Sequence, residues 1–230
     1  MQKPVIKIEV VSDVVCPWCY IGKRRLERAI ATVSDEFDFD VEYQPFELNA
    51  AMPKAGRNQK EYLTAKFGST AQYEKIIAST TQVADEEGLH FNFAIQHVAP
   101  NTRDAHRIIW LAKNEGKQLA MKEAFMKAYF EDGIDLSNNE NLVAIATQAG
   151  LEEKKVVDLL HSDYGLAEVV AAEQLNMERG VSGVPFYIIN GKYGISGAQA
   201  PATFIEAFRE IGKELVLENT SCQVDSKECL

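Results

Sequence analysis

The fold is decided by residues 4–19, PVIKIEVVSDVVCPWC. Residues 4–11 are mostly β-branched and apolar, a composition that is typical of a buried β-strand. A Cys-x-x-Cys motif follows at Cys16 and Cys19. Pro17 stands where a helix would begin, because the missing N–H of proline costs nothing at the first helical position. The stretch therefore predicts a strand that leads two cysteines to the start of a helix.

The next elements downstream extend this start into a βαβ unit. Residues 17–33 have apolar side chains at helical spacing, namely Leu26, Ala29, Ile30 and Val33. Residues 35–46 alternate between apolar and acidic side chains, which is the period of a half-buried strand. A strand, a helix and a strand within this length predict two parallel strands joined by a crossover helix.

The middle of the chain has a different pattern, with no convincing strand between residues 55 and 180. Its helical patterns cover residues 58–67, 70–87, 101–115, 117–131, 138–149, 152–161 and 165–179. Glycines at or near the ends of several of these patterns are suited to left-handed helix caps. We therefore expect an all-helical block between two sheet-forming ends.

A second sheet-forming region begins after Gly180. Residues 186–189, FYII, predict a strand, and Asn190-Gly191 is a dipeptide preferred in two-residue hairpin turns. Residues 192–196 then return antiparallel, and Pro201 opens a last helix. The order βαβ, helices, ββα predicts an α/β fold whose two ends form one discontinuous domain.

Composition narrows the class of protein. The chain has 230 residues, 46% apolar and 25% charged, with a net charge of −10. Such acidity argues against nucleic acid or an anionic membrane as the main partner. No apolar run approaches the roughly 20 residues that span a bilayer, and no secretory signal is expected. With only four cysteines in 230 residues, we expect a cytoplasmic protein whose close cysteine pair is redox-active or binds a metal.

The spacing of Cys16 and Cys19 has a chemical meaning at a helix start. If Cys16 is the N-cap, the backbone amides of Trp18 and Cys19 are expected to hydrogen-bond its sulfur and favour the thiolate. Cys19 lies one turn further along the same face and should be the more buried. We predict that Cys16 is the nucleophile and Cys19 the resolving thiol. The alternative is a structural pair or half of a zinc site, but no histidine is near in sequence.

Four stretches in order resemble the DsbA-like thioredoxin-fold oxidoreductases, specifically the FrnE-type subgroup. They are residues 12–22 (SDVVCPWCYIG), 45–49 (PFELN), 101–107 (NTRDAHR), and 183–190 continuing through 196–199 (GVPFYIIN and SGAQ). The resemblance covers residues 5 to about 215. It implies a thioredoxin-like core over residues 1–55 and 181–217, interrupted by a helical insertion at 56–180, with a polar tail at 218–230. It also implies thiol–disulfide oxidoreductase or isomerase activity.

The resemblance also implies how substrate is held. The bond between Val184 and Pro185 should be cis and face the cysteines, which leaves the Val184 backbone free to pair with an extended substrate chain. Pro17 and Trp18 are expected beside it. Asn49 is expected either to contact a bound peptide or thiol or to serve as a turn residue.

Two other functions stay open. The same superfamily includes glutathione-dependent isomerases and transferases, which typically carry serine where this chain has Cys16 and an acid near positions 196–199. Here Ala198 and Gln199 are neutral, which counts against a dedicated glutathione site. The other alternative is a non-catalytic peptide- or zinc-binding protein. The expected partners are protein or peptide thiols and disulfides, with glutathione or a reductase; no cofactor or metal is expected.

A second cysteine pair, Cys222 and Cys229, lies in the polar tail. A gap of this length can close into a disulfide loop, and some FrnE-like proteins carry such a pair in a C-terminal extension. We predict a second redox pair that exchanges electrons with the first. A tail pair without a role is the alternative.

Polar residues near the motif complete the candidates. Asp13 is close enough to relay protons to Cys19, and His106 is expected either to shuttle protons or to join the helical block to the core. The basic side chains that follow the motif are expected to form a solvated face, namely Lys23, Arg24, Arg25 and Arg28.

Overall fold

A mixed four-stranded sheet forms the centre of the computed structural model, which describes the backbone of residues 3–225 and the side chains of residues 3–215. The strands are β1 (Val5–Ser12), β2 (Asp38–Pro45), β5 (Phe186–Ile189) and β6 (Tyr193–Ser196), in the order β2-β1-β5-β6. Strand β1 pairs parallel with β2 and antiparallel with β5, and β5 pairs antiparallel with β6. The predicted βαβ and ββα ends are confirmed and share one sheet.

Every helical pattern predicted in the middle of the chain forms a helix. The helices are α1 (Pro17–Thr32), α2 (Gln59–Phe67), α3 (Thr70–Glu86), α4 (Arg103–Asn114), α5 (Gln118–Phe130), α6 (Asn139–Gln148), α7 (Glu153–Leu160), α8 (Leu166–Glu178) and α9 (Pro201–Asp225). A short pair, β3 (Arg57–Asn58) with β4 (Val98–Ala99), is added to the expected elements. Two residues are too few to show an alternating pattern, so the sequence could not reveal this pair.

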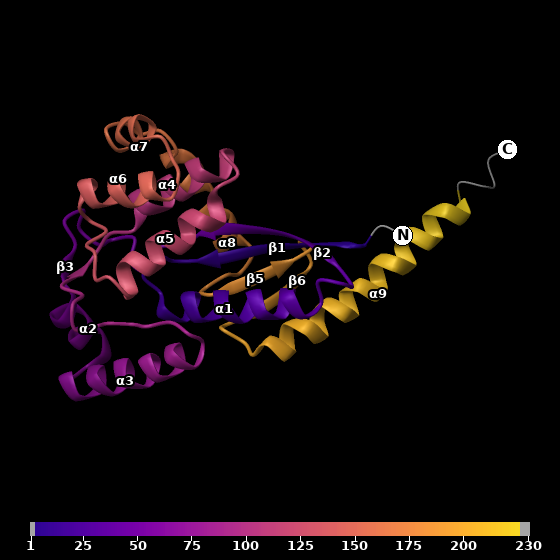
Figure 1. Ribbon diagram of the computed structural model, residues 1–230, viewed down its shortest axis with the longest axis horizontal. Helices are drawn as coiled ribbons and strands as arrows, with labels where there is room; N and C mark the ends of the chain where they lie inside the picture. Colours follow the sequence, from indigo (N-terminus) through magenta and orange to yellow (C-terminus); the bar gives the residue numbers. More distant parts are fainter. Residues whose placement is uncertain (1–2, 226–230) are drawn as a thin grey trace.

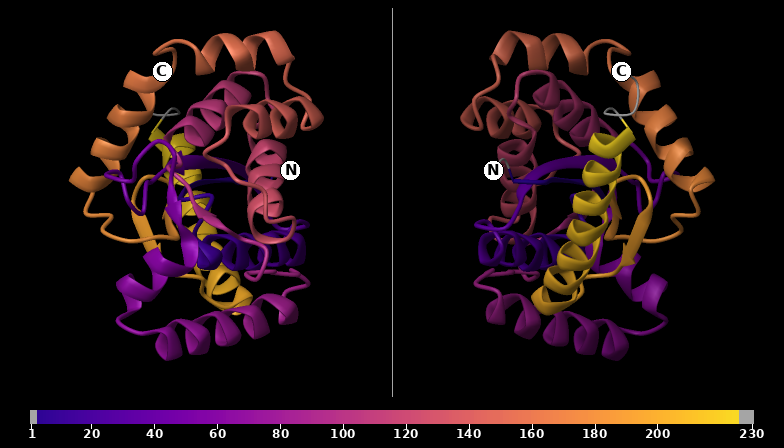
Figure 2. Two further views of the ribbon diagram at one scale, coloured as in Figure 1. Left: turned by 90° about the vertical axis from the view of Figure 1, so that its left-hand side faces the viewer. Right: turned by 90° about the vertical axis from the view of Figure 1, so that its right-hand side faces the viewer.

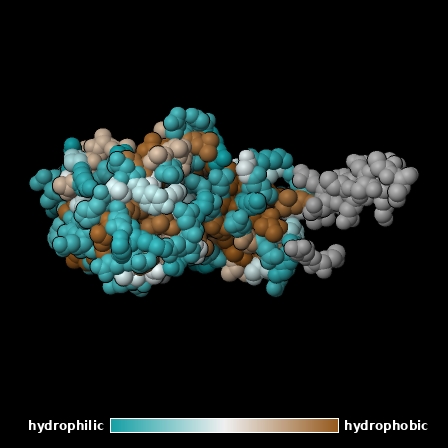
Figure 3. Space-filling model, turned by 90° about the horizontal axis from the view of Figure 1, so that it is seen from above, coloured by the Kyte–Doolittle hydropathy of each residue, from teal (hydrophilic) through white to brown (hydrophobic). Residues whose placement is uncertain are grey.

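Helices cover both faces of the sheet. Figure 1 shows α1 and α9 below the sheet, where they contact each other, and α4, α5 and α8 above it. Helices α2 and α3 form a hairpin beside α1, most clearly separate from the other helices in Figure 2. Within residues 3–225, none of the helices combines the length and the apolar character needed to cross a membrane. The face seen in Figure 3 is largely hydrophilic, with small apolar patches.

Two hydrophobic cores meet along α1. The sheet core joins buried side chains of the sheet to Leu26 and Ala29 of α1 and to Phe204 and Phe208 of α9. The insertion core joins buried side chains of α4 to α7 to the active-site end of α1, including Cys16, Cys19, Tyr20 and Ile21. The first turns of α1 therefore pack on the inserted helices, and its later turns pack on the sheet.

The edge strand β2 is fixed to the insertion by a side chain of α5. Gln118 accepts a hydrogen bond from the backbone amide of Tyr43 and donates one to its carbonyl, each at 2.9 Å. These bonds satisfy backbone groups that an edge strand would otherwise leave unpaired. They also hold α5 above the carboxyl end of β1, where the Cys-x-x-Cys motif begins.

Helix α9 continues to Asp225, beyond residue 217, where the core was expected to end. The backbone of Cys222 lies in this helix, but its side chain and all of Cys229 lie outside the described residues. The second redox pair stays a prediction.

Candidate active site

The Cys-x-x-Cys motif lies at the strand-to-helix junction, as predicted. After β1 a turn closes with a 3.3 Å hydrogen bond from the Cys16 amide to the Asp13 carbonyl. Cys16 then takes the N-cap position with an extended backbone, and Pro17 is the first helical residue. The exposed fractions are 4% for Cys16, 2% for Cys19 and 40% for Trp18. The pair is thus shielded from water while the tryptophan between them projects outward.

The expected contact between helix amides and the Cys16 sulfur is wrong. Cys16 makes no side-chain cap hydrogen bond, and the Cys19 amide bonds instead to the Cys16 carbonyl at 3.0 Å. The Cys16 thiol instead donates to the Val184 carbonyl at 3.7 Å. The cysteine is therefore aimed at the Val184–Pro185 segment.

The Val184–Pro185 bond is cis, as the resemblance implied. The segment is held in place from behind, since the Pro185 carbonyl accepts a 2.8 Å hydrogen bond from the Gly197 amide. Helix α1 approaches it at Gly22, where an added Cβ would collide with the Tyr187 hydroxyl and lie 3.2 Å from Pro185. Only a glycine at this position lets α1 pack so closely behind the cysteines.

Cys19 is the deeper sulfur of the pair. Burial raises the pKa of the Cys19 thiol well above its ordinary value, and contact with Cys16 raises it further. A thiol that holds its proton this firmly attacks a disulfide readily only if a neighbouring group stabilises its thiolate form.

The group best placed to do so is Lys122 of α5, which the sequence analysis missed. Its side chain is 0% exposed, and its ammonium donates to the Ser12 carbonyl at 3.2 Å and lies 5.5 Å from the centre of the Tyr43 ring. Burial lowers the pKa of Lys122 to about 8, against the opposing effect of nearby Cys19, Asp13 and Cys16 charges. Its positive charge in turn lowers the pKa of Cys19. A visible signal existed, because Lys122 shares a helical face with buried Gln118, Phe125 and Met126.

Asp13 and His106 form a second buried polar pair beside Lys122. The ring nitrogen Nε2 of His106 lies 3.2 Å from one carboxylate oxygen of Asp13, and the Leu48 amide donates to the other at 2.8 Å. Burial would raise the pKa of Asp13, but the hydrogen bond and charge of His106 outweigh it and lower the pKa. The pair also ties α4 to the active-site turn, so both roles considered for His106 are compatible with its position.

A polar cavity of about 230 Å³ lies on the far side of these groups. His106 and Lys122 line it together with Glu42, Lys113 and Glu168. A space of this size and polarity can hold several water molecules, since one needs about 10–15 Å³ and polar partners. Water in this cavity would lie close to His106 and Lys122, although both side chains are buried.

Two glutamates lie near Asp13: the buried side chain of Glu47 on the loop after β2 and the half-buried Glu173 on α8. One carboxylate oxygen of Glu47 forms a 2.8 Å ion pair with Arg103. The other oxygen is buried and has no hydrogen-bond partner among the described residues. Burial, and then the charge of Glu47, raises the pKa of Glu173 on α8 to about 7. Glu173 is thus an acid that changes charge near neutral pH a short distance from the active site.

Asn49 follows on the same loop and has the turn role, while its contact with a peptide or thiol stays a prediction. Its side-chain oxygen accepts a hydrogen bond from the backbone amide of Ala51 at 3.1 Å, as expected for a residue that stabilises a turn. Its amide donates to the Tyr62 hydroxyl at 3.2 Å. It also lines a cavity whose wall includes Pro17.

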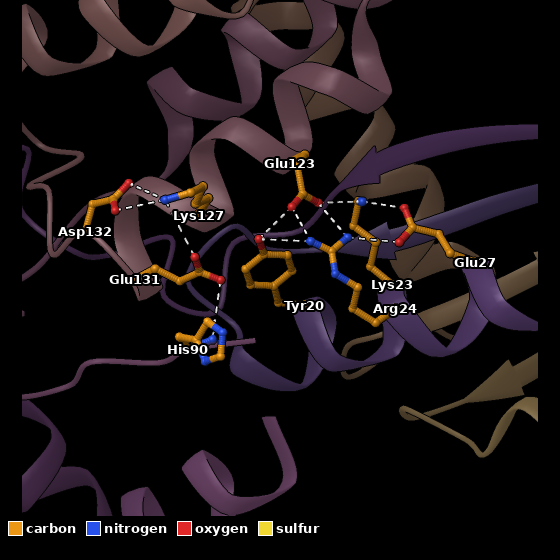
Figure 4. Close-up of polar contacts among 9 residues, drawn as sticks. All are labelled: Tyr20, Lys23, Arg24, Glu27, His90, Glu123, Lys127, Glu131 and Asp132. Atoms are coloured by element: carbon orange, nitrogen blue, oxygen red, sulfur yellow. Dashed lines mark hydrogen bonds and ion pairs between the residues drawn. The ribbon is translucent and has the colours of Figure 1, made fainter. Parts of the chain in front are cut away.

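The basic side chains of α1 do not form a solvated face. Lys23 and Arg24 are ion-paired with Glu123 of α5, which also accepts a 2.7 Å hydrogen bond from Tyr20 (Figure 4). The remaining two, Arg25 and Arg28, pair with the buried Glu87 that follows α3. Lys23 and Arg24 also pair with Glu27 of the same helix, which the local spacing could indicate, but Glu123 and Glu87 come from distant parts of the chain and could not be found in this way. These pairs clamp α1 to the insertion.

A metal site is not formed by the residues that the structure describes, where no three His, Cys, Asp or Glu side chains come together suitably.

Comparison with known proteins identifies the family. Residues 7–209 match the DSBA-like thioredoxin domain. The chain belongs to the DsbA-like thioredoxin family. The match spans both ends of the sheet and all the inserted helices, so the DsbA-like domain accounts for nearly the whole chain.

Similar proteins support the same placement. The structure resembles a probable DsbA oxidoreductase, SCO1869 from Streptomyces coelicolor, with 33% identity, a TM-score of 0.83 and 89% of each chain covered. The sequence is 25% identical to the uncharacterized protein YwbO of Bacillus subtilis, over 91% of this chain and 98% of that protein. The cytosolic disulfide reductase DsbM from Pseudomonas aeruginosa, solved with GSH, has the same fold at 13% identity, with a TM-score of 0.60 and coverages of 94% and 99%.

These findings support thiol–disulfide oxidoreductase chemistry in general for this DsbA-like chain. The FrnE-type subgroup is compatible with them and stays a prediction.

Proposed function

We propose that this protein exchanges disulfides with protein or peptide substrates through Cys16 and Cys19. The observation that carries the proposal is the orientation of Cys16, whose sulfur faces the Val184 carbonyl while Cys19 lies deeper beside a buried lysine. In this proposal the Cys16 sulfur reacts at the expected substrate segment, and the charge of Lys122 favours the thiolate of Cys19.

The exchange proceeds in two steps, formation of a mixed disulfide and its resolution. The Cys16 thiolate attacks one sulfur of a substrate disulfide, so a mixed disulfide forms and the other substrate sulfur leaves as a thiolate that takes up a proton. The Cys19 thiolate then attacks the Cys16 sulfur and releases the second substrate thiol. Two electrons pass from the protein dithiol to the substrate disulfide, and the reverse sequence oxidises a substrate dithiol.

Lys122 and the Asp13–His106 pair are proposed to stabilise the thiolates and to transfer the protons of these steps. A lysine with a pKa of about 8 carries positive charge at neutral pH and stabilises the developing Cys19 thiolate. Water in the neighbouring cavity is proposed to receive the protons that leave this site. This arrangement favours a resolving step that works near neutral pH.

Substrate is proposed to lie along the Val184–Pro185 segment, with Pro17, Trp18 and Asn49 around it. The exposed Trp18 offers an apolar surface beside the buried sulfur. Glutathione or a reductase is the proposed electron partner, and a cytoplasmic location is part of the same proposal. The tail pair, Cys222 and Cys229, is proposed to pass electrons to the first pair.

The test compares single cysteine variants of the full chain in a protein-disulfide turnover assay. Cys16→Ser should abolish exchange, and Cys19→Ser should accumulate mixed disulfides that are visible on non-reducing gels. Cys222→Ser tests the tail pair separately, because slower turnover in this variant would support electron transfer from that pair. Repeated turnover by Cys19→Ser at the wild-type rate would contradict the resolving role. Tight glutathione binding without exchange would instead favour an isomerase or transferase, and bound zinc would favour a non-catalytic protein.

A further inference from the structure

Lys122 is the one buried cation without a carboxylate partner among the side chains of residues 3–215. The buried lysines and arginines in this part of the chain are Lys23, Arg107 and Lys122. Lys23 pairs with Glu123 at 2.5 Å, and Arg107 pairs with Asp104 at 2.7 Å. The ammonium of Lys122 has no such pair within these residues, where it forms one hydrogen bond, to a backbone carbonyl. Since an ammonium has three N–H donors, two of them remain for another acceptor.

The neighbouring acidic groups leave this charge uncompensated. Asp13 is bound to His106, whose Nε2 lies 3.2 Å from its carboxylate. Cys19 holds its proton, because burial raises the pKa of its thiol well above the ordinary value. Burying a charge without a partner is unfavourable, so an anion placed beside Lys122 would be bound favourably.

The polar cavity that Lys122 lines has room for such an anion. Its volume is about 230 Å³, whereas one water molecule needs about 10–15 Å³. Lys113 and Glu168 belong to its wall and are also exposed, so this end lies nearest to solvent. Lys113 is ion-paired with Glu42, and the side chain of Gln118 is bonded to the backbone of β2. Lys122 is therefore the positive charge of the wall that an anion would find unpaired.

The acidic side chains around the cavity limit the charge of the anion. The carboxylate of Glu168 is exposed at the wall, and the whole chain has a net charge of −10. Repulsion grows with the charge of the ligand, so a dianion is disfavoured more than a monoanion. The single unpaired charge of Lys122 likewise matches one negative charge.

We propose that this cavity is a binding site for one small monovalent anion, such as formate, bicarbonate or chloride, which pairs with Lys122. The anion and the Cys19 thiolate compete for the same positive charge, so each weakens the other. An occupied site should therefore slow the resolving step. This effect rests on the proposed disulfide exchange, whereas binding of the anion does not.

The binding experiment follows line broadening of ¹³C-labelled formate by the reduced full-length protein at pH 7. Sodium lactobionate keeps the ionic strength constant, because this bulky sugar acid supplies monovalent charge without the small size of formate. We expect broadening that saturates. Unlabelled bicarbonate and chloride are then added separately, and the one that displaces formate at the lower concentration identifies the source of the anion.

Paired variants locate the site. Lys122→Met should weaken formate binding about tenfold or more, because it removes the charge. Lys127→Met is the matched control on the same helix, since Lys127 is half exposed and paired with Asp132. Ala172→Phe should weaken binding by filling the cavity from α8. Ala171→Phe is its control, because Ala171 is exposed and does not belong to the wall.

The pH dependence tests the same charge without any substitution. The pKa of Lys122 is about 8 in the folded protein, so its charge is present at pH 7 and is lost as the pH rises. Formate binding to the wild type should therefore weaken about tenfold or more between pH 7 and 9.5. The other titratable groups that face Lys122 or share its cavity are Glu42, Lys113, Glu168, His106, Asp13, Cys16 and Cys19. A Cys19 thiolate formed at high pH acts in the same direction, because it repels the anion.

The kinetic experiment tests the coupling to Cys19. A preformed mixed disulfide on Cys16 should decay about threefold more slowly in saturating formate than in lactobionate at the same ionic strength. Half a unit in the pKa of the Cys19 thiol changes its thiolate fraction by this factor. Lys122→Met should decay at the same rate in both salts.

Each outcome has a defined meaning. Saturable formate binding that Lys122→Met and Ala172→Phe weaken, and that their controls retain, supports the site. A wild type without saturable binding, or binding that persists in Lys122→Met or Ala172→Phe, overturns it. If Lys122→Met fails to fold, binding that stays constant from pH 7 to 9.5 overturns the site. Binding without slower decay overturns the coupling. If no mixed disulfide forms, the proposed exchange fails, and the titration still decides the anion site.

Discussion

Replacing Lys122 with methionine is expected to make the protein more stable and its resolving step slower. In the folded protein burial lowers the pKa of Lys122 from 10.5 to about 8. At 1.36 kcal/mol per unit, this fall corresponds to a cost of about 3 kcal/mol for holding the charged form in the folded state. The folded-state pKa lies below the unfolded value, so the cost is fully present below about pH 8 and disappears as the pH rises toward 10.5.

The assay is urea unfolding of the reduced protein at several pH values between 7 and 10.5. At pH 7, Lys122→Met should raise the free energy of unfolding by up to about 3 kcal/mol, and the advantage should shrink toward pH 10.5. Lys127→Met is the matched control on the same helix, because Lys127 is half exposed and ion-paired at the surface with Asp132. Such a pair is worth at most about 1 kcal/mol.

The same variant should release substrate more slowly. Without the cation the pKa of the Cys19 thiol rises further, and each unit reduces the thiolate about tenfold. Decay of a preformed mixed disulfide at pH 7.5 measures this step. A variant that is no more stable than wild type at pH 7, or whose stability difference stays constant to pH 10.5, would refute the role assigned to the buried charge.

Three further changes have defined effects on stability. The pKa of Glu123 is about 2 despite partial burial, mainly through its hydrogen bonds to Arg24 and Lys23, so its stabilisation is present above pH 4.5 and is lost as the pH falls toward 2. Glu123→Gln should therefore cost about 2 kcal/mol at pH 7 in urea unfolding, with no difference at pH 2. The pKa of Glu173 is raised to about 7, so the wild type should lose stability as the pH rises from 4.5 to 7. Glu173→Gln should not show this loss, and equal pH profiles of the two proteins would contradict the assignment. Gly22→Ala should cost about 1–3 kcal/mol by overpacking, whereas Gly183→Ala, which has open space and ordinary φ, should change the free energy of unfolding by less than about 0.5 kcal/mol.

Most elements of the fold could be predicted from local sequence patterns. The alternation in residues 35–46 predicted β2, and the Asn190-Gly191 turn takes the positive φ angles expected, 50° and 68°. Both signals depend only on neighbouring residues, because side-chain direction repeats every two residues in a strand and turn type fixes φ. The boundaries of the inserted helices were found within one or two residues for the same reason.

Contacts between distant segments could not be predicted in this way. Lys122 reaches the cysteines, and Glu87 and Glu123 reach the basic side chains of α1, only because the insertion folds back over the active site. The orientation of the Cys16 sulfur toward Val184 likewise depends on a segment from the other end of the chain. Helical period placed Lys122 on a buried face but could not say which buried groups would meet it there.

Because α1 packs on two separate cores, the active site cannot be moved to a smaller protein by keeping the sheet alone. A chain spliced from residue 55 to residue 181 would keep all four strands of the sheet, with Leu26 and Ala29 still packed on them. It would expose Tyr20 and Ile21, release Lys23 and Arg24 from Glu123, and remove Lys122 from behind Cys19. The sheet supplies the attachment point for the cysteines, and the inserted helices supply their surroundings, so neither part carries the chemistry by itself.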